Sequence, residues 1–274
     1  MNIKRWWYRI GQFWNYYRRA VSIHHVDSPY LSRLLSISLD EKRWYYAFEE
    51  LELLRNEMKQ SDHTIKRIDW GREGKEYETS IDVIAGKSLC SARECRFLFR
   101  LIQEFKPNCI LELGTSLGLT TLYISRAAAS AEIHTVEGDP RLAGLARQHF
   151  RWFEGKNIEQ HTGPFEKILP ELLDKQRATD FSFVDGHHRK APTVEYMTAI
   201  LKKSAVKSIH ILHDIYHKPG MEEAWQILRK REEVDASIDM FQFGMLIKNP
   251  DLFDPIHLSL IPSRWKPWSM GLFR

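Results

Sequence analysis

The chain has 274 residues, of which 43% are hydrophobic and 28% charged, enough to build one large domain or one domain with an appendage. Its formal net charge of +4 is too small to argue by itself for nucleic acid as a partner. No apolar run approaches the roughly 18 residues that span a bilayer, and the N-terminus lacks the apolar core of a signal peptide. We therefore expect a cytoplasmic protein. Cys90, Cys95 and Cys109 show no CxxC spacing, which indicates reduced thiols and no zinc site built on them.

The first twenty residues contain five Lys or Arg, seven aromatic residues and no acid. Trp6, Ile10, Phe13 and Tyr17 recur at helical spacing, which predicts a basic amphipathic helix. We favour a helix that docks this aromatic stripe on the body of the protein or on a second copy in a homodimer. A membrane-surface contact and a nucleic-acid contact through stacking aromatics are the alternatives that we do not favour.

Residues 28–60 continue with helical patterns, and the polar, glycine-containing segment 61–80 predicts a loop or a short hairpin. This segment is the best candidate boundary. We predict a helical N-terminal extension over residues 1–85 and a second domain over residues 86–274.

From about residue 86 the pattern alternates between amphipathic helices and short apolar strands. Helices are predicted at 91–105, 120–130, 140–153, 164–176, 189–203 and 220–231, and strands at 108–113, 131–137, 158–163, 180–185 and 206–214, with two closing strands within 234–249. This alternation predicts an α/β fold of the Rossmann-like, doubly wound class, with a mostly parallel sheet covered by helices on both faces.

A glycine-rich turn follows the first of these strands, in the stretch LELGTSLGLT. In a doubly wound sheet the turns beyond the carboxyl ends of the strands bind the ligand, so the residues of this turn are candidates for binding: Glu112, Gly114, Thr115, Ser116 and Gly118. The glycines follow a G-x-x-x-G spacing, which differs from the G-x-G-x-x-G of dinucleotide sites, and no Gly-Lys-Ser/Thr follows, which excludes a P-loop.

The second strand ends in Glu137, at the distance from the glycine turn where an acid can accept hydrogen bonds from both ribose hydroxyls of an adenosine. An acid, a G-x-x-x-G turn and a second acid on the next strand resemble the first motifs of class I S-adenosylmethionine-dependent methyltransferases.

Residues from about 86 to 248, including TGPFEKILPELL, DFSFVDGHHRKAPTVEY and IHILHDI, resemble the small O-methyltransferases of the catechol and caffeoyl-CoA type. The resemblance implies a seven-stranded sheet with an antiparallel last strand and S-adenosylmethionine as cofactor, but it does not identify the substrate. It implies cofactor contacts at Glu112, Gly114, Thr115, Ser116, Gly118, Glu137, Gly163 and Asp185.

Asp185 and Asp214 follow neighbouring predicted strands, so their carboxylates should share one rim of the sheet. In the resembling enzymes these positions bind a divalent cation, usually magnesium, but Ile215 stands where the family has a third ligand. Capping of adjacent helices, or contact with the methionine end of the cofactor, is the other interpretation of the two aspartates.

His188 lies where the family places a lysine as general base, and an imidazole suits proton removal at neutral pH. We therefore predict His188 and Asp185 as catalytic residues, within a segment that also contains His187, His213 and His217.

The sequence thus predicts O-methylation of a small molecule. Methylation of RNA or protein is an alternative, although the fourth strand ends in VDGHH and lacks the Pro-Pro signature of amide and amino methylation. A cofactor-binding interaction protein without catalysis is the other alternative, and Ile215 is the residue that favours it.

Overall fold

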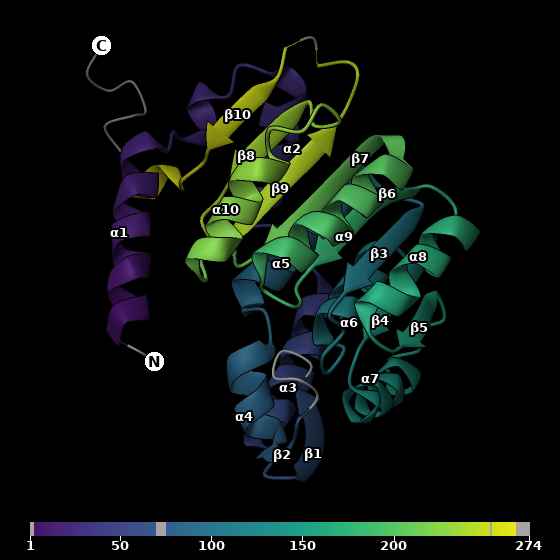
Figure 1. Cartoon of the computed structure of the whole chain (residues 1–274). Helices are drawn as coiled ribbons and strands as arrows, with labels where there is room; N and C mark the ends of the chain where they lie inside the picture. The colour runs from purple at the N-terminus through teal and green to yellow at the C-terminus, as the bar shows by residue number, and fades with distance from the viewer. Residues whose placement is uncertain (1–2, 70–74, 253, 267–274) are drawn as a thin grey trace. The chain divides into compact units, whose positions relative to one another are not determined.

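The structure is a computed structural model that describes residues 3–69, 75–252 and 254–266 (Figure 1). The chain divides into two compact units, one comprising Met1–Ser36 with Ala178–Arg274 and the other Ile37–Arg177, and each is described by itself. These units differ from the division into 1–85 and 86–274, which stays a prediction.

The unit Ile37–Arg177 contains a two-stranded antiparallel hairpin and three parallel strands in the order β3-β4-β5. Its strands are β1 (Thr64–Asp69), β2 (Lys75–Ser80), β3 (Cys109–Leu113), β4 (Glu132–Glu137) and β5 (Ile158–Thr162). Its helices are α3 (Tyr46–Gln60), α4 (Ile81–Ser88), α5 (Ala92–Phe105), α6 (Leu119–Ala127), α7 (Pro140–Trp152) and α8 (Phe165–Lys175). The hairpin confirms one of the two alternatives predicted for segment 61–80.

The other unit contains five strands in the order β10-β8-β9-β7-β6. They are β6 (Thr179–Val184), β7 (Ser204–His213), β8 (Ala236–Asp239), β9 (Phe243–Lys248) and β10 (Ile256–Ser259). The helices of this part of the chain are α1 (Ile3–Arg19), η1 (Ile23–His25), α2 (Pro29–Leu39), α9 (Lys190–Lys203), α10 (Pro219–Leu228) and η3 (Ser263–Trp265).

Apart from the hairpin, the described residues of the two units contribute three and five strands, eight in all and one more than the seven expected, and the predicted α/β, Rossmann-like and mostly parallel class is confirmed. As expected, an antiparallel strand closes the series, since β9 runs against both β7 and β8. The additional strand is β10, which pairs in parallel with β8. Its four residues, IHLS, alternate between apolar and polar, but so short a segment does not establish a strand before its partner is known.

Local signals in the sequence explain where the elements around the candidate turn begin. All five residues of β3 are buried, as expected of a parallel strand covered on both faces. Ser91 and Glu94 form a capping box at the start of α5, and the Asp139 carboxylate accepts hydrogen bonds from the first backbone amides of α7. Helix α6 begins directly after Gly118, which occupies its N-cap with a φ of 82°.

Helix α1 forms as predicted, and the carboxyl-terminal part of the predicted stripe packs, since Phe13 and Tyr17 lie against a buried cluster that contains Tyr16. Tyr16 is buried, and the Phe13 ring meets the Phe241 ring edge to face at 5.1 Å. Trp6 and Ile10, in contrast, are 44% and 41% exposed. The helix therefore docks through Phe13, Tyr16 and Tyr17, and the first two members of the predicted stripe stay exposed.

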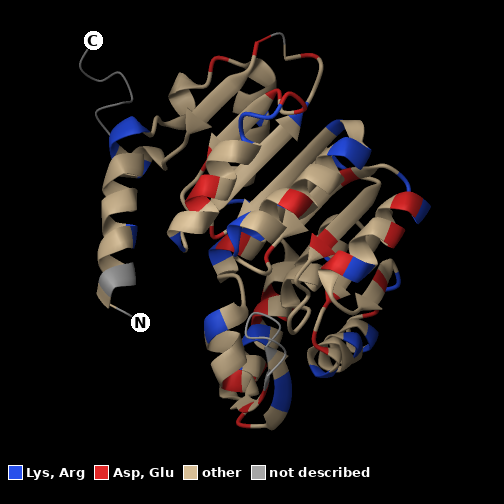
Figure 2. Cartoon of the chain, in the orientation of Figure 1, with Lys and Arg blue, Asp and Glu red and all other residues tan. Residues whose placement is uncertain are grey.

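Basic side chains also gather at the carboxyl end of α1, where Arg18 and Arg19 occupy the last turn (Figure 2). This placement complements the partial negative charge of the helix end. None of the described helices combines the length and the apolar character needed to cross a bilayer. The three cysteines are buried and form no disulfide.

Candidate functional site

The turn that follows β3 has the backbone geometry that its glycines predict. Gly114, Ser116 and Gly118 have φ values of 107°, 51° and 82°, in the region that favours glycine. A Cβ added at Gly118 would lie 2.6 Å from the Phe150 Cε1 atom, so α6 can approach α7 only without a side chain there. The turn is held to β4 because the Gly114 amide donates to the Val136 carbonyl at 3.0 Å.

A chain of hydroxyl groups holds Glu112 beneath this turn. Thr121 and Thr135 donate to Glu112 Oε2 at 2.5 and 2.6 Å. Because Thr135 uses its only proton in this way, the hydroxyl of Thr115, 2.6 Å away, donates to Thr135. Thr121 and Thr135 were not predicted from the sequence. The parallel register that places Thr135 opposite Glu112 becomes known only from the sheet.

Glu137 is turned toward the same loop. Its Oε2 accepts the Ser116 amide at 2.8 Å and its Oε1 accepts the Asp139 amide at 2.9 Å. Burial raises the pKa of Glu137, and these two hydrogen bonds offset part of that effect. A carboxylate has about four acceptor positions, so Glu137 retains capacity for two hydroxyl donors.

Gly163, at the end of β5, has a φ of 150° and donates its amide to the Glu137 carbonyl at 2.9 Å. Six of the predicted cofactor residues thus gather with Gly163 at the carboxyl ends of β3, β4 and β5: Glu112, Gly114, Thr115, Ser116, Gly118 and Glu137.

The hairpin strand β1 supports this region through Asp139, a residue that the site prediction did not include. The Ile68 amide donates to Asp139 Oδ2 at 2.9 Å, and Arg67 Nε lies 3.5 Å from the same oxygen. The Asp-Pro pair that starts α7 was the signal for a capped helix next to Glu137.

The other unit brings the remaining predicted residues together at the ends of β6 and β7. Asp185 follows β6, and its Oδ1 lies 2.8 Å from His213 Nδ1 and 3.6 Å from His188 Nε2. Although burial opposes the shift, the nearby imidazoles lower the pKa of Asp185. The carboxylate of Asp185 is therefore ionised at neutral pH.

Asp214 pairs with His217, whose Nδ1 lies 3.1 Å from Asp214 Oδ2, and the rings of His188 and His217 stack at 5.2 Å. Burial lowers the pKa of His188, against the opposing effect of Asp185 and Asp214. The His187 Nδ1 atom lies 3.1 Å from the Tyr196 hydroxyl. Three of the four predicted histidines thus join the two aspartates, in what we call the Asp-His cluster: Asp185, His188, His213, Asp214 and His217.

Strained backbone accompanies this cluster. His187, His188 and Asp214 have φ values of 64°, 33° and 57°, which side-chain-bearing residues rarely adopt. Such strain gathers at functional sites more often than elsewhere, so it supports a functional role for the cluster.

Comparison with known proteins is consistent with this geometry. A model described as a methyltransferase domain matches residues 111–215. A transmembrane O-methyltransferase homolog of Rattus norvegicus is 33% identical over 130 residues, which is 46% of this chain and 47% of that protein. A catechol O-methyltransferase of Niastella koreensis is 27% identical over 164 residues, covering 54% and 73% of the two chains. The chain spans about half the length, or less, of the transmembrane O-methyltransferase relatives that it matches.

Solved structures share the fold. An O-methyltransferase from Bacillus cereus in complex with SAH superposes with a TM-score of 0.56 and 17% identity, covering 78% of this chain and 96% of that one. The O-methyltransferase TomG from Streptomyces achromogenes, in complex with SAM, gives 0.55 and 18% identity over 76% and 92%. Residues 111–215 therefore match a methyltransferase domain, and the chain has the fold of these solved O-methyltransferase structures.

Proposed function

We propose that the chain transfers a methyl group from S-adenosylmethionine to a hydroxyl group of a small-molecule acceptor. The observation that carries the proposal is the turn 114–118 between two acids, the buried Glu112 below it and the partly buried Glu137 beside it. When bound, the cofactor would supply an electrophilic methyl group on a sulfonium: the acceptor oxygen would bond to the methyl carbon in line as the carbon–sulfur bond breaks, and S-adenosylhomocysteine would leave. The protein must hold the two partners in that geometry and remove the acceptor proton.

Several groups of the loop are suited to hold an adenosyl compound. Glu137 has acceptor capacity for two ribose hydroxyls. The Ser116 hydroxyl is buried with no hydrogen-bond partner among the described residues, so it has a donor to offer a ligand. Gly114 and Gly118 leave the backbone open to close approach, and Gly163 and Asp185 complete the proposed cofactor contacts.

We further propose that His188 removes the acceptor proton. Its lowered pKa keeps the imidazole neutral at pH 7, as a general base requires. Its Nδ1 is buried with no hydrogen-bond partner among the described residues. Asp185, 3.6 Å from Nε2, would stabilise the imidazolium that forms.

The Asp-His cluster matches only part of the magnesium site of the O-methyltransferases that the sequence resembles. Asp185 and Asp214 supply two carboxylates, but each already lies against an imidazole. Ile215 is fully buried, and a Cβ at Gly244 would meet its Cγ2 at 3.0 Å, so this position faces the core. Magnesium prefers an octahedral set of oxygen ligands. The proposed proton transfer therefore involves no metal, and a cation at Asp185 and Asp214 is the alternative that chelation tests.

The cofactor assignment is tested by calorimetry of S-adenosylmethionine with Glu137→Ala. Loss of charge-assisted hydrogen bonds worth about 1.5–3 kcal/mol each should weaken binding at least tenfold. Glu171→Ala, which removes an exposed acid of α8, is the matched control and should leave affinity unchanged. Unchanged affinity in Glu137→Ala, or comparable binding of NADH, would contradict the assignment.

The proton route is tested with His188→Ala, first with catechols, because the Niastella relative is named for that acceptor. We expect lower turnover with unchanged cofactor affinity, while His187→Ala keeps its turnover. Full turnover in His188→Ala would show that the proton leaves by another route. Loss of activity on chelation, restored by magnesium, would favour the metal alternative.

The location and assembly of the protein are also proposals. We propose a cytoplasmic homodimer in which a second copy covers the exposed aromatic residues of α1: Trp6, Trp7 and Trp14. The mass of the purified chain in solution, with cell fractionation, tests both.

A further inference from the structure

Strands β4 and β5 carry a second group of histidines, within the unit Ile37–Arg177. In their parallel register His134 lies opposite Glu159, and His161 is two residues further along β5. Alternate residues of a strand face the same side of the sheet, so the three side chains share one face. None of the proposed catalytic or cofactor residues belongs to this group.

The donor atoms of these side chains converge. His134 Nδ1 lies 3.2 Å from His161 Nε2 and 3.6 Å from Glu159 Oε2, and His161 Nε2 lies 3.6 Å from Glu159 Oε1. One ligand atom from each residue lies within 4.8 Å of the other two. Ligands held about 2.0–2.1 Å from a tetrahedral zinc ion are separated from one another by about 3.3 Å. The observed separations match that arrangement.

The surroundings also suit an ion. Glu132 Oε1 lies 3.1 Å from His134 Nε2, the ring nitrogen that the group does not use; the pair is outside hydrogen-bonding geometry here, and a small rotation of the carboxylate would give the carboxylate–histidine–metal arrangement of metalloproteins. The His134 side chain is only 5% exposed, which holds its ring in place, whereas Glu159 is 62% exposed. Solvent can therefore reach the fourth ligand position through the Glu159 side.

We propose that His134, Glu159 and His161 bind a divalent transition-metal ion of the zinc type, with water as the fourth ligand. Two imidazoles and one carboxylate form a donor set typical of zinc and unlike that of magnesium. The ion links β5, the last strand of the sheet order, to β4, whose final residue is Glu137. Metal binding therefore stabilises the edge of the sheet beside the proposed cofactor loop, and it is independent of methyl transfer.

The test is calorimetric titration of the metal-free full-length protein with Zn²⁺, supported by Co²⁺ absorption in the visible range. The Asp-His cluster could bind zinc as well, so the titrations use the background His188→Ala with His217→Ala. In that background we expect one equivalent of metal and the intense bands of tetrahedral Co²⁺. Glu159→Gln, an exposed and conservative change, should weaken binding at least tenfold, and His161→Ala should abolish it.

Matched control variants distinguish metal coordination by Glu159 from a general effect of negative charge on metal affinity. Glu171→Gln removes another exposed acid near His161 and should leave the affinity unchanged. Glu132→Gln should weaken binding about 10- to 100-fold, as losses of such outer partners do. Zinc should also raise the melting temperature of the background protein and not that of Glu159→Gln.

The proposal is overturned if the background protein binds no zinc at micromolar concentration. It is also overturned if Glu159→Gln and His161→Ala bind zinc with the same affinity as the background protein. In either case His134 and His161 form only a hydrogen-bonded pair. Because Glu159 and His161 are the more exposed members, their variants should fold, and circular dichroism of each variant verifies it.

Discussion

The backbone angle φ of Gly118 helps to determine the geometry of the proposed cofactor loop. Its φ of 82° is costly for any residue with a side chain, and the Phe150 ring occupies the space that a methyl group would need. Ser116, two residues earlier, adopts a φ of 51° while its amide is bound by Glu137. The conformation of the turn therefore depends on two residues: Gly118, whose missing side chain leaves room for Phe150 of α7, and Ser116, whose amide donates to the Glu137 carboxylate.

Replacing Gly118 by Ala should lower the free energy of unfolding by about 1–3 kcal/mol, the usual cost of such backbone strain, and should weaken S-adenosylmethionine binding. Gly144→Ala is the control, since Gly144 lies inside α7 with no atom within 4 Å of an added Cβ. It should be neutral or stabilise by about 0.5–1 kcal/mol. Denaturant unfolding measures both variants, and equal effects would show that φ and Phe150 impose no constraint.

His210 makes stability depend on pH. It is fully buried between the hydroxyls of Ser182 and Ser208, at 2.9 and 3.0 Å, and burial lowers its pKa to about 3, helped by the charge of Lys248. The unfolded chain has a histidine pKa near 6.5, so it binds the proton more readily than the folded protein does between these values. The contribution is present above pH 6.5 and is lost as the pH falls toward 3.

Between pH 6.5 and pH 3 the free energy of unfolding of the wild type should fall by on the order of 5 kcal/mol through His210 alone, because each unit of pKa difference corresponds to about 1.36 kcal/mol. Urea unfolding at several pH values should show a shallower dependence in His210→Gln. Some dependence should persist, because burial also lowers the pKa values of His161 and His188. The same slope in both proteins would show that His210 is protonated without unfolding.

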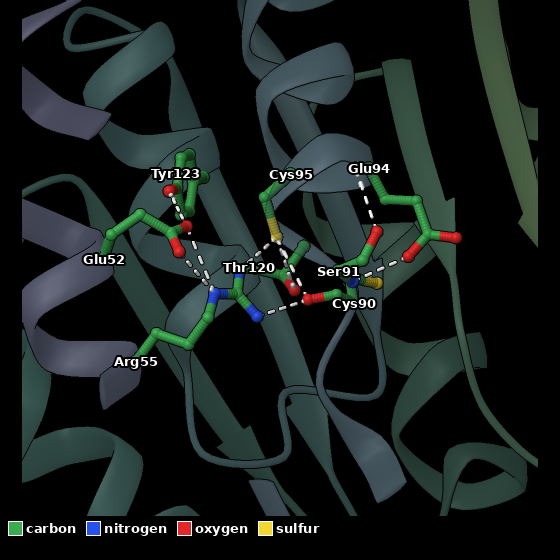
Figure 3. A network of polar contacts seen from close by, with 8 residues as sticks. All are labelled: Glu52, Arg55, Cys90, Ser91, Glu94, Cys95, Thr120 and Tyr123. Atoms are coloured by element: carbon green, nitrogen blue, oxygen red, sulfur yellow. Dashed lines mark hydrogen bonds and ion pairs between the residues drawn. The ribbon is translucent and has the colours of Figure 1, made fainter. Parts of the chain in front are cut away.

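At the scale of elements, a buried network ties α3 to the helices α5 and α6 (Figure 3). Arg55, on α3, is almost fully buried; its guanidinium donates to the Cys90 carbonyl and to Cys95 Sγ, 3.3 Å away, and contacts Glu52 at 3.1 Å. Tyr123 on α6 donates to the same Glu52 at 2.6 Å. One arginine thus positions the helix that begins directly after the proposed cofactor loop.

Arg55→Met should destabilise the protein by about 3 kcal/mol, because it leaves Glu52 and the Cys90 carbonyl without their buried donor. Arg126→Met is the matched control. Arg126 pairs with Glu50, also on α3, but at 3.4 Å and at the surface, where ion pairs contribute about 0–1 kcal/mol. Thermal unfolding of the two variants distinguishes them, and a small effect in Arg55→Met would mean that water replaces its contacts.

At the scale of the molecule, the first helix belongs to the same compact unit as the C-terminal strands. Asp239, fully buried on β8, accepts hydrogen bonds from Arg19 at 2.7 Å and from Tyr216 at 2.6 Å. Phe13 and Tyr16 cover Phe241, with ring centroids 5.1 and 5.4 Å apart. The helix is therefore integrated into its unit by a buried charge and by apolar contacts.

Deleting residues 1–25 should cause aggregation or a change of oligomeric state, because it uncovers Phe241 and leaves Asp239 without its cation. Light scattering and size-exclusion chromatography measure the outcome, and cofactor calorimetry shows whether the loop after β3 is intact. Arg19→Met, which removes only the cation, should destabilise without changing the mass in solution. A truncated protein that keeps its oligomeric mass and its stability would show that α1 contributes neither to assembly nor to stability.

The sequence by itself determined the class of fold, the order of the helices and strands up to β9 and the conformation of the glycine turn. These depend on local information: helical and strand periodicity, helix caps, and glycines at positions of unusual φ, as in 114–118. It also predicted that Asp185 and Asp214 would follow neighbouring strands, because β6 and β7 alternate with helices in the regular way.

Only the tertiary structure decided which side chains meet. Thr135 opposes Glu112, and His134 opposes Glu159, because of a sheet register that no local pattern encodes. The face of α1 that packs is determined by the position of Phe241. Strand β10 forms because its residues pair with the edge of β8. Side chains distant in the sequence are brought together by long-range packing, and the positions of their partners are set by the whole fold.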